Sequence, residues 1–113
     1  MLKVILFFFV FVSSATNAKQ VTCKVEFFDK PPQVFQGKCD FDTKNIGLKG
    51  QPGSFALNPI NSDLFGQINL DITSPGNAKA SVFNYKNVDV YFVKRLESDP
   101  ACWGNNKINI CAR

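Results

Sequence analysis

The chain has 113 residues, of which 13 are Lys or Arg and 9 are Asp or Glu, with four cysteines and no histidine. Without histidine it cannot form a Ser-His or Cys-His nucleophile, and the usual zinc sites lose their nitrogen ligands. The basic residues are scattered, and only Lys94 and Arg95 are adjacent. This pattern lacks the basic cluster that nucleic-acid binding usually requires, so we expect no nucleic-acid partner.

The first 18 residues have the order of a secretory signal peptide. Lys3 precedes an unbroken apolar run at residues 4–12, and small or polar residues follow at 13–18. We predict cleavage after Ala18, with a cut after Ala15 as the alternative. The apolar run is well short of the roughly 20 residues that span a bilayer. We therefore expect a periplasmic or secreted protein with no membrane span after cleavage.

Cleavage would leave residues 19–113, which is 113 less 18, or 95 residues, enough for one domain. Lys3 leaves with the signal, so 12 basic and 9 acidic residues remain and the formal charge falls from +4 to +3. All four cysteines lie in this part of the chain. An even number of cysteines in a short exported chain argues for two disulfides.

Apolar and polar residues alternate on both sides of Pro31, which predicts a β-hairpin. Folding the chain about Pro31 places Cys23 opposite Cys39 and Phe27 opposite Phe35, all on the apolar face. Cysteines directly opposite each other on neighbouring strands can lie within disulfide reach. We therefore expect a Cys23–Cys39 disulfide that joins the two strands.

Alternation predicts a second hairpin over residues 68–83, with its turn at 74–77. A two-residue loop there would pair Ile72 with Lys79 and put the apolar faces out of phase. We therefore expect an odd-length loop, with a bulge as an accompaniment. Further strands are expected at residues 54–57, 88–96 and 107–111, and residues 60–66 could make one helical turn. Glycines and prolines at 47, 50, 52, 53 and 59 predict loops in the middle of the chain.

The last two cysteines flank the turn sequence Gly104-Asn105-Asn106, which predicts a short hairpin closed by a Cys102–Cys111 disulfide. Four cysteines allow three connectivities, and the sequence does not exclude cross-pairing. We favour the two local pairs because each closes one hairpin. Trp103 is expected to pack as a core ring next to this disulfide.

Residues that could carry chemistry are few. Asp40 and Asp42 share one strand face, but the glycine and distal glutamate of an EF-hand are not in register, so we expect no metal and no cofactor. A hydrolase that uses only two carboxylates is conceivable. With nine acidic residues in a small domain, a close carboxylate pair is hard to avoid, so it carries little weight.

Three aromatic residues are candidate partner-binding anchors by residue type: Phe28, Phe65 and Tyr91. Phe28 falls on the strand face opposite Phe27. Tyr91, together with Val93, falls on the face opposite Val90 and Phe92. Such residues either contact a second layer of the fold or form an exposed patch.

Four short motifs, C-D-F at 39–41, G-S-F at 53–55, A-C-W at 101–103 and I-C-A at 110–112, resemble those of a group of small exported bacterial proteins with two disulfides and no assigned activity. The resemblance spans most of the exported part and implies no active site. The chain is also similar to periplasmic lysozyme inhibitors in size, β content and disulfide use, although it lacks the S-G-x-x-Y motif of one group of them. Immunity proteins against wall-degrading toxins share the small disulfide-linked design.

The sequence predicts an all-β fold, a small disulfide-stapled antiparallel sandwich or partly open barrel of about six strands. We expect an exported non-enzymatic binding protein whose partner is another protein, such as an inhibitor or immunity protein acting on a cell-wall hydrolase. The alternative is a structural or envelope-associated protein with no dedicated target.

Overall fold

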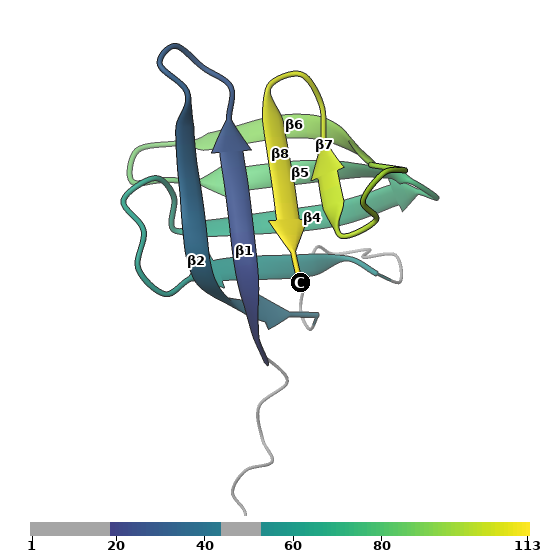
Figure 1. Ribbon diagram of the computed structural model, residues 1–113, viewed down its shortest axis with the longest axis horizontal. Coiled ribbons are helices and arrows are strands. Elements are labelled where there is room, and N and C mark those ends of the chain that lie inside the picture. Colours follow the sequence, from purple (N-terminus) through teal and green to yellow (C-terminus); the bar gives the residue numbers. More distant parts are fainter. Residues whose placement is uncertain (1–18, 44–52) are drawn as a thin grey trace, which may run out of the picture.

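A computed structural model describes residues 19–43 and 53–113, and these residues form a closed antiparallel β-barrel (Figure 1). The expected all-β class is confirmed, and the barrel has eight strands instead of about six. The described residues contain no helix, so the helical turn at 60–66 was wrong. The strands are β1 (Lys19–Phe27), β2 (Gln33–Asp42), β3 (Phe55–Pro59), β4 (Gln67–Ser74), β5 (Asn77–Phe83), β6 (Val88–Arg95), β7 (Cys102–Gly104) and β8 (Ile108–Ala112).

Each strand pairs with the next along the chain, and β8 pairs with β1 to close the barrel. In Figure 1, β1, β2, β7 and β8 lie in front of β4, β5 and β6 and run across them. The β6–β7 junction has only two residue pairs, Lys94 with Gly104 and Arg95 with Trp103. The barrel is therefore closed by a short contact on this side, whereas β5 and β6 pair along seven residues.

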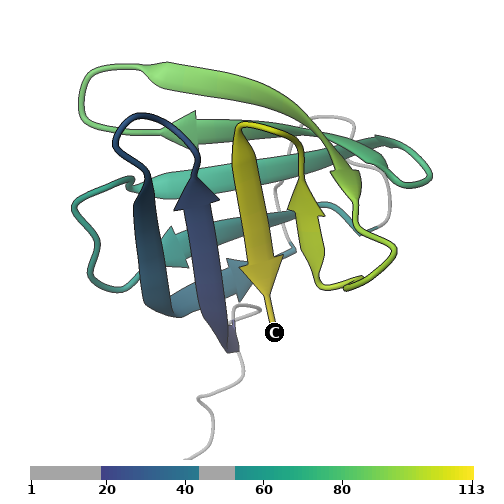
Figure 2. The ribbon, with the colours of Figure 1, turned by 45° about the horizontal axis from the view of Figure 1, so that its top comes forward.

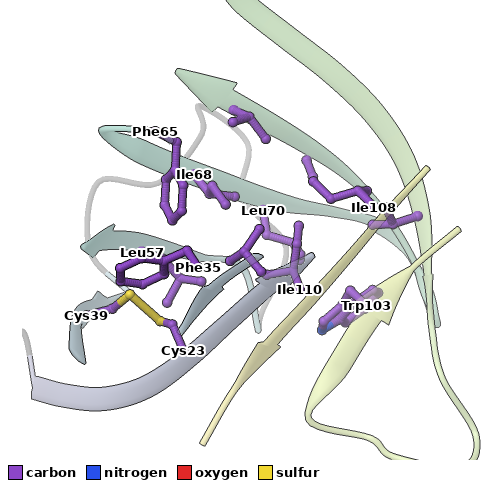
Figure 3. Close-up of a cluster of buried hydrophobic side chains, with 14 of the residues drawn as sticks. Cys23, Phe35, Cys39, Leu57, Phe65, Ile68, Leu70, Trp103, Ile108 and Ile110 are labelled. Carbon is purple, nitrogen blue, oxygen red and sulfur yellow. A yellow bond between two sulfur atoms is a disulfide. The ribbon is translucent and has the colours of Figure 1, made fainter. Parts of the chain in front are cut away.

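The inward positions of the strands form one apolar core, in which Leu57, Ile68 and Leu70 are fully buried (Figure 3). The alternation of buried and less buried positions along β4 and β5 matches the period of a strand with one face on the core. The alternation therefore shows which residues of each strand face outward.

The first hairpin has the expected faces but a different register. Cys23 lies opposite Gly37, and Cys39 lies opposite Val21, so the pairing is shifted by two residues. A shift of two keeps every side chain on its face. The Cys23–Cys39 disulfide is present and joins diagonal neighbours whose Cα atoms are 5.9 Å apart. Gly37 leaves space for the Phe35 ring, whose Cζ would lie 3.2 Å from a Cβ at that position.

The second hairpin keeps a two-residue loop at Pro75 and Gly76, so the expected odd-length loop was wrong. The expected bulge is present between Ile72 and Ser74, and it restores the phase by pairing Ile72 with Ala78. Gly76 has φ of 78°, a left-handed conformation that favours glycine in this turn.

The C-terminal hairpin matches the prediction. Cys102 pairs with Cys111 across β7 and β8, their Cα atoms are 4.0 Å apart, and they form the second disulfide. The two local connectivities are thus confirmed. Trp103 is buried in the core, and the Arg95 guanidinium lies 5.1 Å from the centre of its ring.

The faces of β6 are reversed from the expected pattern. Val93 is 2% exposed and belongs to the core, whereas Val90 and Phe92 face outward. Both faces of this strand are apolar, so alternation could not select the buried one. Pairing with β5 selects it, because Val93 and Tyr91 lie opposite the buried Ala78 and Ala80, whose small side chains leave room inside the barrel.

Several sequence predictions lie outside the described residues. These are the signal peptide at residues 1–18 with both cleavage sites, and the loop positions 47, 50 and 52. They remain predictions.

Candidate binding surface

The outward face of β6 carries an exposed row of apolar side chains, Val88, Val90 and Phe92. Phe83 of β5 lies directly opposite Val88 and is also exposed. We call these four residues the β6 strip. Phe92 is 73% exposed, although an aromatic ring of this size would contribute strongly to a core. A contiguous apolar row on a barrel wall is typical of an interaction surface.

The loop between β5 and β6 extends the β6 strip at one end of the barrel. The Asn84 side-chain oxygen accepts hydrogen bonds from the backbone N–H of Lys86 (3.1 Å) and Asn87 (3.0 Å). The Asn84 N–H donates to the Asn87 carbonyl at 3.0 Å. This closed turn presents Tyr85, which is 89% exposed. Because these hydrogen bonds already order the loop backbone, binding through Tyr85 would lose less conformational entropy than binding through an unconstrained loop.

The structure separates the three aromatic anchors that the sequence predicted. Phe28, the first residue of the β1–β2 loop, is 47% exposed and remains a candidate contact residue. Phe65 is 3% exposed, with its ring centre 5.5 Å from that of Phe35, so its ring packs in the core and does not form an exposed contact. The apolar side chain of this loop residue covers part of the core.

Tyr91 is partly buried against the core. Burial raises the pKa of its hydroxyl, and the nearby carboxylates of Asp89 and Asp29 raise this pKa further. Tyr91 therefore packs against the core and does not belong to the β6 strip.

Basic residues flank the β6 strip. Lys94 is the next outward residue of β6 after Phe92, and Lys79 of β5 lies opposite Phe92. Lys86, in the loop before β6, is also exposed. The ion pair found between described residues joins Arg113 to Asp99, and none of these three lysines lies within ion-pair distance of a described carboxylate. An apolar row with free cations around it favours a partner with acidic groups.

A second surface is a shallow depression of about 580 Å³ on the outer wall of the barrel. The Asn109 amide donates to Glu26 at 3.1 Å, and Arg113 donates to Asp99 at 3.0 Å. The lining residues, of mixed charge and including both cysteines of the second disulfide, are Thr22, Lys24, Glu26, Gln36, Leu96, Asp99, Cys102, Asn109, Cys111 and Arg113.

The chemistry of this depression does not favour catalysis. The side-chain hydrogen bond from Arg113 is the main cause that lowers the pKa of Asp99, and backbone hydrogen bonding from Ala101 lowers it further. A general acid needs the opposite shift, toward the working pH. Within residues 19–43 and 53–113 all cysteines are in disulfides, and no cluster of His, Cys, Asp and Glu could hold a metal ion.

Comparison with protein-family models, with curated proteins and with solved structures finds no match to this chain. Among the described residues, no helix has the length and apolar character needed to cross a membrane. The functional assignment therefore depends on the surface of the barrel itself.

Proposed function

We propose that the protein is an exported, non-enzymatic binding protein that recognises another protein through the β6 strip. The observation that carries this proposal is the outward row of Val88, Val90 and Phe92 on a strand whose opposite face already supplies the core. A ring that is 73% exposed gains little for folding, so its position on a barrel wall is better explained by a contact.

Export is supported by the two disulfides. Such bonds persist in oxidising compartments such as the periplasm and the cell exterior. Cys23 and Cys39 are fully buried, so reductants have little access to that bond (Figure 3). A closed barrel held by two crosslinks is also a rigid support for an interface, which limits the entropy lost on binding.

We further propose a cell-wall hydrolase as the partner, bound as an inhibitor or as an immunity protein binds a toxin. Glycoside hydrolases of the common kind carry two carboxylates around the scissile bond. The projecting pair Tyr85 and Lys86 supplies an aromatic ring and a cation on a hydrogen-bonded turn. These two side chains have the chemistry to occupy an acidic cleft that normally accepts sugar rings.

The test measures hydrolase activity on purified peptidoglycan with the oxidised exported protein added. Candidate hydrolases are first captured from periplasmic extract. We expect inhibition that saturates near equimolar protein, and loss of inhibition for Phe92→Asp. Lys38→Asp is the matched control, because it also places a carboxylate at an exposed position, on β2.

Equal inhibition by both variants would exclude the β6 strip as the contact surface. Absence of any specific partner in repeated captures would contradict the binding function, and the envelope-associated structural alternative would then stand. Activity of the protein itself on peptidoglycan would overturn the non-enzymatic assignment.

A further inference from the structure

The first part of β6 has a paired neighbour on one side only. Its pairing with β5 runs from Val88 to Lys94, whereas its pairing with β7 is limited to Lys94 and Arg95. In Figure 2, β6 runs along the top of the molecule and reaches β7 only at its end. Within the described residues, the edge from Val88 to Val93 therefore has no strand beside it.

The hydrogen-bond pattern shows which backbone groups lie on this open edge. The Arg95 N–H donates to the Gly76 carbonyl on the β5 side, and the Leu96 N–H donates to the Cys102 carbonyl on the β7 side. Because successive residues of a strand direct their N–H and C=O groups to opposite sides, the even-numbered residues of β6 face the open edge. Val88, Val90 and Phe92 thus direct their backbone groups away from β5.

One of these groups is already satisfied. The Asn105 side-chain amide donates to the Phe92 carbonyl at 2.9 Å and marks the end of the open edge. Among residues 19–43 and 53–113, we find no hydrogen-bond partner for the N–H and C=O groups of Val88 and Val90 or for the N–H of Phe92. Unpaired groups on a strand edge are a template for another strand, which proteins normally avoid or cover.

The residues with these edge groups are the same residues that form the apolar row, so backbone and side-chain recognition coincide. Every second position from 86 to 94 reads Lys, Val, Val, Phe, Lys. A strand added beside them would place alternate side chains against the apolar row, with its end residues next to Lys86 and Lys94. Acidic residues at both ends would complement these two cations.

The same charge pattern argues against a second copy of this chain as the occupant. A twofold antiparallel pair centred on Val90 would bring Lys86 of each copy near Lys94 of the other at the ends of the paired segment, where β7 already occupies the backbone edge of Lys94. Like charges brought close together on neighbouring strands are destabilising. The charges therefore favour a different protein over self-association.

We propose that β6 binds its partner by strand addition: an extended partner segment with three alternating apolar residues, flanked by acidic residues, pairs with the edge from Val88 to Phe92. This inference rests on the proposed binding function and specifies its mode. Main-chain hydrogen bonds supply part of the affinity, and the row of Val and Phe side chains favours partner segments with alternating apolar residues.

The probes are linear peptides selected from a displayed random library on the oxidised exported protein. We expect selected peptides to alternate apolar and polar residues with acidic ends. Val90→Pro removes one edge N–H and keeps an apolar side chain, whereas Val90→Ala keeps the N–H and removes most of the side chain. Proline is tolerated where a strand N–H does not pair, so the β5–β6 ladder is preserved.

Strand addition predicts that Val90→Pro weakens peptide binding about tenfold or more, the range expected for loss of a hydrogen bond or two, and that Val90→Ala weakens it less. The reverse order would overturn the proposal and leave a side-chain contact only. Recovery of no peptide, or of peptides without alternation, would also overturn it.

A second measurement does not depend on the folding of the proline variant. Two versions of one selected peptide are N-methylated on alternate residues, in the two possible phases. Only one phase places methyl groups toward β6, so we expect one version to lose binding and the other to keep it. Equal effects of the two versions would refute strand pairing. If a captured hydrolase still binds Val90→Pro at full strength, strand addition fails while the proposed function stands.

Discussion

Neighbouring residues of β6 provide the sharpest stability test, because the structure assigns them to opposite faces of the barrel wall. Phe92 is 73% exposed and Val93 is 2% exposed. We consider replacing each by threonine, which is β-branched and compatible with a strand at both positions. The two variants then differ chiefly in whether the new hydroxyl lies in water or in the core.

Val93→Thr keeps the volume of the side chain but buries a hydroxyl among apolar groups. Protein mutational data put the cost of burying such a group at about 1 to 3 kcal/mol, so we expect a loss of about 2 kcal/mol. Phe92→Thr removes a ring of which about a quarter is covered. Full burial of such a side chain is worth about 1.5 to 3 kcal/mol, so a quarter gives about 0.5 kcal/mol.

The measurement is the free energy of unfolding from guanidinium titration of residues 19–113 with both disulfides intact. We expect Val93→Thr to be less stable than Phe92→Thr by about 1.5 kcal/mol, the difference between the two costs above. Equal losses, or a larger loss for Phe92→Thr, would mean that β6 presents its other face to the core, and the β6 strip would then not be a surface.

Three further predictions concern the frame of the barrel. Replacing Cys23 and Cys39 together by serine removes a crosslink with a sequence separation of 16. In the chain-entropy model the free energy of unfolding should fall by about 3 kcal/mol, measured by guanidinium titration. An unchanged midpoint would mean that this disulfide does not stabilise the fold by constraining the unfolded chain. Gly104→Ala would place its Cβ 2.9 Å from the Ile108 carbonyl oxygen and should cost about 1 to 3 kcal/mol, whereas Gly66→Ala, with 3.8 Å to its nearest atom, is the tolerated control in the same assay. Asp99 has a lowered pKa in the folded protein because its arginine partner donates hydrogen bonds to it. The stabilisation by this carboxylate is therefore present above the unfolded pKa and lost as pH falls through the folded pKa. We expect Asp99→Asn to be less stable than the parent at neutral pH and equal to it in strong acid, and a difference that persists in acid would refute this.

The strands and both disulfides could be predicted because alternation and cysteine spacing are local signals. The register of the first hairpin could not be predicted, because the same faces are buried whether Cys23 lies opposite Cys39 or opposite Gly37. In the second hairpin the bulge between Ile72 and Ser74 reconciles a two-residue turn with the correct faces.

The candidate surface was harder to predict than the fold. β6 is apolar on both faces, so the sequence pointed to Tyr91 and Val93 as the off-face residues and missed the exposed pair Val90 and Phe92. The useful signal was in the neighbouring strand, where alternate small residues of β5 must face the bulky side of β6. Closure of the barrel by only two residue pairs depends on strand tilt and on where β7 ends, and no local pattern reports it.

The most direct test of the proposed binding function is site-specific photocrosslinking in cells that produce the protein. A photoreactive phenylalanine analogue replaces Phe92 in one strain and Lys38, exposed on β2, in a control strain. We expect a discrete crosslinked product from position 92 that is absent from position 38 and is lost when Val90→Asp is added. No product from position 92, or the same products from both positions, would contradict the β6 strip as the contact surface.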